Sequence, residues 1–219
     1  EEIKDTAGAA AKFGVRIVNG FAGSKIWHAL AMFPQVPPSM IEAGYQDFAD
    51  RWNPILDVFD EVGVVFGLEV HPSEIAYDFW TTQRTLEAIN HRPAFGINFD
   101  PSHLYWQGIE PVPSIRALTG AIHHVHAKDT YVDPYNTAVN GVLDTKPYAD
   151  IVKRSWTFRS VGYGHDLLSW RNLISELRLA GYDYVLSIEH EDALASVEEG
   201  FTKAVSFLKD VLLLEEPAA

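Results

Sequence analysis

Residues 94–103 of this 219-residue chain read Ala94-Phe95-Gly96-Ile97-Asn98-Phe99-Asp100-Pro101-Ser102-His103. The first six form a short apolar run without the alternation of a half-exposed strand, which is typical of a parallel strand covered on both faces. An aspartate and a histidine follow almost at once. A buried strand that ends in ionisable side chains recurs along the chain, and this recurrence indicates the fold.

Apolar runs and helical patterns alternate on both sides of this stretch. The sequence predicts strands at 15–21, 64–70, 94–99, 122–127 and 184–188, and helices at 39–62, 75–90, 111–119, 166–180 and 194–214. Ser39 is the expected N-cap of the first helix and Gly63 its end, and Pro54 is expected to kink or break it. Residues 1–12 resemble the tail of a helix, and residues 129–165 a long irregular loop.

This alternation predicts an α/β fold, either doubly wound or a (β/α) barrel. No glycine-rich phosphate motif follows a strand, so a dinucleotide-binding fold has no support. A closed barrel needs eight strands, and five are found. Because the chain also begins Glu1-Glu2 without a methionine, we expect the first three βα units to be absent from it. We expect residues 1–219 to form one domain.

The composition excludes several classes of function. There is no cysteine, so disulfides, thiolate metal ligands and a cysteine nucleophile are ruled out. The formal charge of −13 argues against a nucleic-acid partner, which requires a basic face. No apolar run reaches the ~20 residues that a membrane span needs. We therefore expect a cytoplasmic protein with no membrane and no nucleic-acid partner.

Four strands each deliver a carboxylate or an imidazole at the carboxyl end, where barrel active sites lie. The candidates for a shared metal site are Glu69, Asp100, His126 and Glu189. Three oxygen donors and one imidazole suit Mn²⁺, Mg²⁺, Co²⁺ or Zn²⁺. The alternative is a set of separate surface charges, but four equivalent positions favour one site.

The three histidines of residues 122–127 fall on two faces of a strand. His124 and His126 share one face and His123 lies on the other. Because His126 is nearest the carboxyl end, we assign it as the ligand. His124 is then expected one layer deeper, and His123 is expected to be structural.

Four motifs in this order resemble one known family. They are Glu69-Val70-His71-Pro72, Asp100-Pro101-Ser102-His103, His124-Val125-His126-Ala127-Lys128-Asp129 and Ser187-Ile188-Glu189-His190-Glu191. Together they resemble the sugar phosphate isomerase/epimerase group of the xylose isomerase-like TIM barrels, over about residues 14–214. The resemblance implies a (β/α) TIM barrel of that type.

The resemblance also implies roles for individual residues. Glu69, Asp100, His126 and Glu189 match the metal ligands, with Mn²⁺ the first choice of ion, and Glu69 and Glu189 match the pair that moves the proton. His103 matches a histidine that contacts the substrate during catalysis. Further substrate contacts are implied for His71, Glu74, Arg159 and Trp27, although Trp27 is equally consistent with plain core packing.

The implied activity is metal-dependent isomerisation or epimerisation of a keto sugar through an enediolate. An alternative is a lyase. Residues 159–166 resemble the C-glycoside deglycosidases, which cleave 3-keto glycosides by β-elimination and pair a barrel subunit with a small second subunit. A third alternative is an inactive carbohydrate-binding barrel subunit. The expected partners are a sugar or glycoside substrate and either copies of the chain or a small second subunit.

Overall fold

The computed structural model describes residues 1–30 and 33–215. Contacts along the chain divide it into two compact units. The first contains Glu1–Phe99 and Gly120–Val125, and the second contains Asp100–Thr119 and the residues from His126 onward. The expectation of a single domain stays a prediction, and the two units are described in turn.

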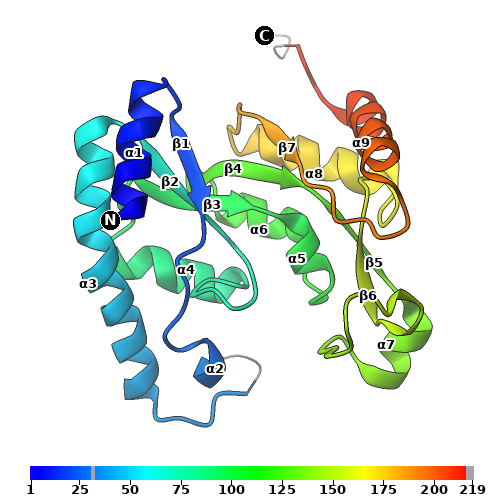
Figure 1. The fold of residues 1–219 in the computed structure, drawn as a ribbon, viewed down its shortest axis with the longest axis horizontal. Helices are drawn as coiled ribbons and strands as arrows, with labels where there is room; N and C mark the ends of the chain where they lie inside the picture. Colours follow the sequence, from blue (N-terminus) through cyan, green and yellow to red (C-terminus); the bar gives the residue numbers. More distant parts are fainter. Residues whose placement is uncertain (31–32, 216–219) are drawn as a thin grey trace. The chain divides into compact units, whose positions relative to one another are not determined.

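The first unit carries a parallel sheet covered by helices (Figure 1). Its elements are α1 (Glu2–Lys12), β1 (Ile17–Gly20), α2 (Trp27–Leu30), α3 (Pro38–Val62), β2 (Val65–Glu69), α4 (Phe79–Ala88), β3 (Phe95–Phe99) and the start of β4 (Ile122–Ala127). β1 pairs with β2, β2 with β3 and β3 with β4, all in parallel. The predicted strands of this unit are therefore confirmed.

The core of the first unit is aromatic. Phe66 of β2 packs against Trp52 of α3 at 4.6 Å between ring centroids and against Phe95 of β3 at 5.7 Å. All three rings are buried, and each removes a large apolar area from water. This packing presses α3 onto the sheet, so the carboxyl ends of β2 and β3 are held in register.

The α3 helix differs from the prediction at two positions. It starts at Pro38, with Pro37 as the N-cap, so Ser39 is not the cap. Proline suits the first helical position because its missing N–H has no partner there anyway. The helix also continues through Pro54, so a break there is wrong, and a kink stays a prediction. The buried residues on either side, Trp52 and Leu56, hold the helix on the sheet despite the lost hydrogen bond.

The second unit contains the remaining elements. They are α5 (Pro101–Tyr105), α6 (Pro111–Ala117), the end of β4, β5 (Asp129–Val132), α7 (Pro134–Asn140), a 3₁₀ turn (Ile151–Lys153), β6 (Trp156–Arg159), α8 (Leu167–Leu179), β7 (Leu186–Ile188) and α9 (Val197–Val211). At the end of β4, the carbonyl of Ala127 accepts a hydrogen bond from the N–H of Glu189. The strand order is therefore β1-β2-β3-β4-β7, and the fifth predicted strand is confirmed.

Residues 129–165 are not the irregular loop that we expected. β5 and β6 pair as an antiparallel ribbon, with Asp129 opposite Arg159 and Val132 opposite Trp156. Between them lie α7 and the 3₁₀ turn. Two helices are also shorter than predicted: α4 begins only after Asp78, which caps it together with Thr81, and α9 begins after Ser196.

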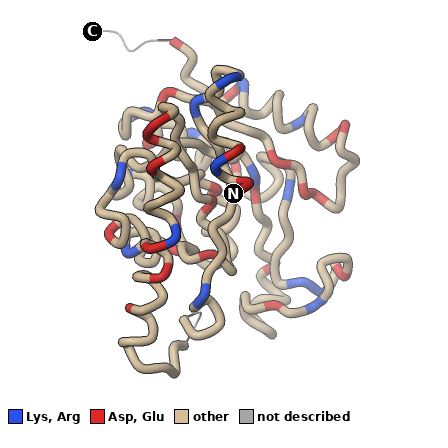
Figure 2. Tube along the Cα trace, turned by 60° about the vertical axis from the view of Figure 1, so that its left-hand side comes forward, with Lys and Arg blue, Asp and Glu red and all other residues tan. Residues whose placement is uncertain are grey.

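Charges of both signs are interspersed along the described chain (Figure 2). In this part of the protein, no helix is long and apolar enough to cross a membrane.

Candidate metal centre

Three of the predicted ligands come together within the second unit. Asp100 is the first residue after β3 and caps α5, where its Oδ1 accepts from the N–H of Ser102 at 2.8 Å. His126 lies at the end of β4, and Glu189 directly follows β7. Parallel strands bring their carboxyl ends to one edge of a sheet, so side chains at neighbouring strand ends can bind one metal ion together.

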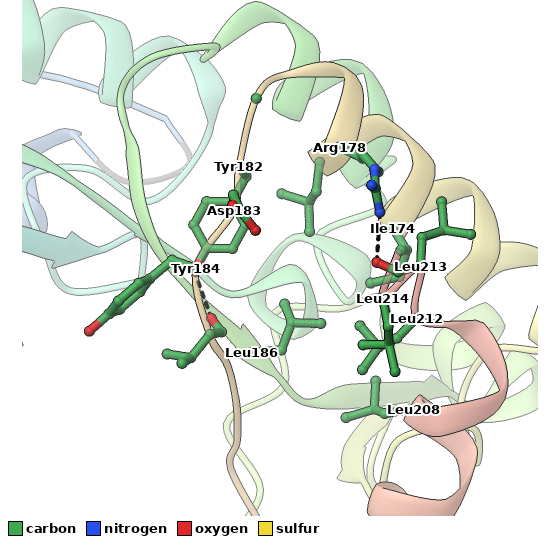
Figure 3. A pocket seen from close by; sticks show the side chains of 13 residues that line it. Ile174, Arg178, Tyr182, Asp183, Tyr184, Leu186, Leu208, Leu212, Leu213 and Leu214 are labelled. Atoms are coloured by element: carbon green, nitrogen blue, oxygen red, sulfur yellow. Dashed lines mark hydrogen bonds between the residues drawn. The ribbon is translucent and has the colours of Figure 1, made fainter. Parts of the chain in front are cut away.

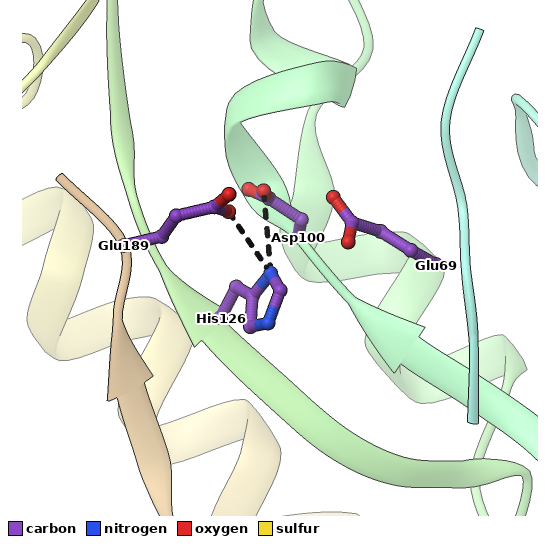
Figure 4. Close-up of side chains that lie close together, drawn as sticks. All are labelled: Glu69, Asp100, His126 and Glu189. Atoms are coloured by element: carbon purple, nitrogen blue, oxygen red, sulfur yellow. Dashed lines mark ion pairs between the residues drawn. The ribbon is translucent and has the colours of Figure 1, made fainter. Parts of the chain in front are cut away.

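The three side chains point toward one another (Figure 4). Nδ1 of His126 lies 3.1 Å from Oε2 of Glu189 and 3.8 Å from Oδ2 of Asp100. One ligand atom of each lies within 4.8 Å of the others. Ligand atoms that share an ion at ~2.1 Å lie about 3 to 4 Å apart. Two carboxylates and one imidazole therefore fit a divalent cation.

The buried charge of Asp100 is offset within the protein by a cationic side chain. Its side chain is fully buried, and Oδ2 has no hydrogen-bond partner of standard geometry among the described residues. A buried carboxylate oxygen is costly unless a cation or donor offsets its charge. Oδ2 faces His126 and the ammonium of Lys128, at 3.1 Å from Lys128 Nζ.

The surrounding charges keep both carboxylates ionised. Burial alone raises the pKa of Asp100, but the charges of His103 and Lys128 and the contact with His126 outweigh burial and hold it well below its ordinary value. The hydrogen bond with His126 is the largest influence on Glu189. Together with the charge of Lys128 it outweighs burial and lowers the pKa of Glu189 to about 2. Both groups therefore stand as carboxylates at neutral pH.

Glu69 belongs to the first unit. It is the last residue of β2, is 6% exposed, and stands opposite Asn98 in the parallel register. Asn98 precedes Asp100 by two residues along β3. Figure 4 draws Glu69 as well. Its membership in the ligand set stays a prediction.

His103 lies with this group of side chains. It is buried on α5, with Nε2 3.6 Å from Oδ2 of Asp100 and 3.4 Å from Nζ of Lys128. The ring also meets the edge of Phe158 at 5.1 Å between centroids. Its contact with a substrate stays a prediction.

Arg159, at the end of β6, has partners within the protein. Its Nε lies 3.1 Å from Oδ1 of Asp192, and its guanidinium lies over the ring of Tyr163 at 5.4 Å. Ser160 N and Leu194 N donate to the same carboxylate. The arginine is therefore held by the turn after β6, and its role toward sugar oxygens stays a prediction.

Three predicted substrate contacts lie in the first unit and bind its loops. Glu74 accepts from the N–H groups of Ala22 and Gly23, at 2.7 and 2.5 Å, so it anchors the loop after β1. Burial raises the pKa of Glu74, and these two hydrogen bonds oppose the shift. The ring of His71 meets Phe21, and Trp27 packs edge-on against Tyr77 at 5.0 Å. Contact of Glu74, His71 and Trp27 with a substrate stays a prediction.

The other two histidines of β4 have partners within the first unit. Nδ1 of His124 lies 2.9 Å from Oδ1 of Asn98, and the residue is buried as expected. Nδ1 of His123 lies 3.1 Å from the carbonyl of Phe66. Its ring fills the space beside Gly96, where a side chain would collide with it.

The sequence leaves two interpretations of Lys128 open, a weak match to the family motif and a salt bridge that ends the strand, and the structure shows salt bridges. The residue is 1% exposed, and its ammonium lies 2.9 Å from Oε2 of Glu189, 3.1 Å from Oδ2 of Asp100 and 3.6 Å from Oε2 of Glu191. The two-residue period of a strand indicated that Lys128 lies beside His126, because residues 126 and 128 lie on the same face. A lysine next to a strand end is usually solvated, so the sequence alone did not predict its burial.

A cavity of about 590 Å³ with both apolar and polar lining lies elsewhere in the second unit (Figure 3). Its lining includes Ile174, Leu177, Leu186 and Leu208. Leu186 opens β7 whereas Glu189 follows its end, so the cavity lies at the amino end of the strand. It holds none of the predicted site residues, and barrel chemistry is found at the opposite, carboxyl end.

The sequence model of the xylose isomerase-like TIM barrel family matches residues 1–211. The chain belongs to this family. Among its curated relatives, the uncharacterised protein YfiH of Bacillus subtilis is 36% identical over 182 residues, which are 82% of this chain and 58% of YfiH. The 3-dehydroshikimate dehydratase of Bacillus anthracis is 30% identical over 84 residues, 38% of this chain and 30% of the enzyme. This chain thus spans less than two thirds of the length of these relatives.

Several solved structures share the fold at low sequence identity. The probable 3-DHS dehydratase AsbF of Bacillus anthracis superposes with a TM-score of 0.69 and 20% identity, over 95% of this chain and 68% of AsbF. The 3-keto-D-glucoside 4-epimerase YcjR of E. coli gives 0.65 and 14%, over 95% and 69%. The IOLI protein, solved with a zinc atom, gives 0.64 and 21%, over 96% and 68%.

Proposed function

We propose that the protein is a divalent-metal-dependent enzyme that moves a proton beside the carbonyl of a keto sugar, as an isomerase or epimerase. The observation that carries this proposal is the convergence of Asp100, His126 and Glu189 at consecutive strand ends. We further propose a cytoplasmic enzyme that acts on a sugar or glycoside and assembles with copies of itself or with a small second subunit.

Asp100, His126 and Glu189 would hold the ion, and Glu69 is proposed as the fourth ligand. The place of Glu69 at the end of β2, opposite Asn98, supports this assignment. Mn²⁺ is our first choice, because mixed carboxylate and imidazole ligands suit borderline cations. When bound, such an ion polarises a carbonyl group and makes the neighbouring C–H more acidic.

The side chains themselves supply the proton transfers and the binding. Glu189 is kept ionised by His126 and Lys128, and about a third of its side chain is exposed, so it can reach a substrate proton. Glu69 is the proposed partner that returns a proton. The buried His103 is suited to donate a hydrogen bond to a substrate oxygen. Arg159, His71, Glu74 and Trp27 are proposed to shape the sugar pocket.

A second candidate is elimination beside a carbonyl, as a lyase on a 3-keto glycoside. The similarity of this chain to a dehydratase favours the lyase hypothesis, because loss of water from 3-dehydroshikimate is an elimination. Its first step, removal of the proton next to the carbonyl, is the same as in an epimerase. The same Glu189 would serve both reactions.

The proposal is tested by proton exchange in D₂O. Mn²⁺-loaded protein is incubated with a panel of ketoses and 3-keto glycosides, and deuterium incorporation and products are followed by NMR. We expect incorporation at one carbon next to the carbonyl, and a loss of at least about 10²-fold in E189Q. The exposed α9 variant E198Q is the control with the same charge change.

The products of this experiment separate the candidates. A rearranged sugar supports the isomerase or epimerase, and a released aglycone supports the lyase. Absence of exchange with every substrate, or full exchange in E189Q, contradicts the proposed function.

A further inference from the structure

Lys128 is buried among the groups proposed to bind metal. Its ammonium contacts the carboxylates of Asp100, Glu189 and Glu191, lies 3.4 Å from Nε2 of His103, and stacks over the ring of Phe158 at 4.5 Å. All of these residues belong to the second unit. With 1% exposure, the ammonium exchanges its lost water shell for these partners.

The contacts of Lys128 use particular oxygen atoms. It approaches Oδ2 of Asp100 and Oε2 of Glu189. These same two oxygens face Nδ1 of His126, so they are the ones that a shared ion would use. Oδ1 of Asp100 accepts a hydrogen bond from the N–H of Ser102.

We propose that Lys128 is a built-in counter-ion that competes with the divalent cation for Asp100 and Glu189, an inference that rests on the proposed metal site. In the metal-free protein it holds both carboxylates in place and offsets their repulsion. Metal entry displaces the ammonium from these oxygens toward Glu191, whose side chain is 44% exposed and already lies 3.6 Å away. Lys128 thereby sets how tightly and how reversibly the metal is held.

The test is a comparison of Mn²⁺ affinity by isothermal titration calorimetry. Protein stripped with EDTA is titrated as wild type, as K128M and as K146M. Methionine keeps the length of the side chain and removes the charge. Lys146 is the matched control because it also pairs with a buried carboxylate of the second unit, at 2.8 Å from Asp144. We expect K128M to bind Mn²⁺ at least about tenfold more tightly, and K146M to stay within about twofold of wild type.

The outcomes separate two failures. If wild type and K128M bind Mn²⁺ equally, or K128M binds more weakly, the competing role of Lys128 is wrong and the metal site stands. If neither protein binds Mn²⁺, the proposed metal site is wrong, and this inference fails with it.

A second variant keeps the inference testable if K128M does not fold without metal. E191Q removes the carboxylate to which Lys128 is proposed to move. We expect it to weaken Mn²⁺ binding by about threefold or more compared with E198Q, which makes the same charge change on α9. Equal affinities of E191Q and E198Q would contradict the proposed displacement.

Discussion

Asp129 holds the turn that follows β6. Its buried Oδ2 accepts from the N–H groups of Gly162, Gly164 and His165, at 3.0, 3.1 and 3.0 Å, and from Nε1 of Trp170 at 3.2 Å. Gly164 has to be glycine, because a Cβ there would lie 2.2 Å from the carbonyl oxygen of Thr130. One carboxylate thus fixes the loop that carries Tyr163, the partner of Arg159.

This arrangement predicts that D129N is strongly destabilising. The amide group of asparagine would meet backbone donors, so buried N–H groups would lose their acceptor, at a cost of about 3 kcal/mol. The control is D133N at the N-cap of α7, where asparagine caps about as well as aspartate and the change stays below about 0.5 kcal/mol. Urea denaturation measures both, and equal losses would contradict the role of Asp129.

Asp192 predicts a pH dependence of stability. Burial alone raises its pKa, but the hydrogen bonds from Ser160 and Leu194 and the charge of Arg159 outweigh burial and hold it below its ordinary value. A lowered pKa contributes stability above the unfolded value of about 3.9, and this contribution is lost as the pH falls below it.

We therefore expect D192N to flatten the fall in unfolding free energy as the pH drops below about 4. Urea denaturation of metal-free protein across this range gives the measurement. D210N, at an exposed position of α9, is expected to follow the wild-type curve. A D192N curve parallel to wild type would show that Asp192 does not carry this dependence.

At the scale of elements, β3 and β4 approach each other closely at Gly96. A Cβ at this position would lie 2.4 Å from the carbonyl oxygen of Ala121 and 2.6 Å from the ring of His123. A Cβ added at Gly8, inside α1, would have no described heavy atom within 4 Å apart from the nearby backbone of its own helix. The strand residue Gly96 therefore has no room for a side chain, whereas the helix residue Gly8 does.

We expect G96A to destabilise the protein by about 1 to 3 kcal/mol, because the strands or the His123 ring have to shift. G8A is expected to stabilise it by up to about 1 kcal/mol, since alanine favours a helix over glycine. Thermal denaturation of the two variants checks the pair. If G96A were neutral, the close contact of β3 and β4 would be wrong.

The strands of the sheet could be predicted because each is a short, mainly apolar run, and the run is buried along its whole length in β3, as at Ile97 and Phe99. The β5–β6 ribbon could not. Its pairing joins Asp129 to Arg159 across thirty positions of mixed polarity, and Tyr131 is 40% exposed, so no buried run marks it. The Ser39 cap and the break at Pro54 failed because the packing of α3 outweighs local preferences.

The candidate site could be predicted in part for the same physical reason. Asp100, His126 and Glu189 each follow a strand, and parallel strands bring such positions together. A salt bridge of Lys128 was one of two open interpretations, but its partners could not be predicted, because they depend on the rotamer of a long side chain. Arg159 was assigned by resemblance, and its ion pair with Asp192 arises only from the folded turn.

For the whole molecule, the proposed ion couples metal binding to stability. A ligand at about 100 times its Kd stabilises the folded state by about 2.7 kcal/mol, which corresponds to a rise in Tm of about 5 to 10 °C for a chain of this size. We expect Mn²⁺ to raise the Tm of EDTA-treated wild type, and EDTA to reverse the effect. D100N is expected to show no rise, whereas E198Q rises like wild type.

The most direct test of the metal centre is anomalous X-ray scattering at the manganese edge from crystals soaked in Mn²⁺. We predict one strong peak within about 2.0 to 2.4 Å of Asp100, His126 and Glu189, with the carboxylate of Glu69 as the fourth neighbour. A crystal saturated with Mn²⁺ that shows no peak at these side chains, with Lys128 still paired to Asp100 and Glu189, would contradict the account.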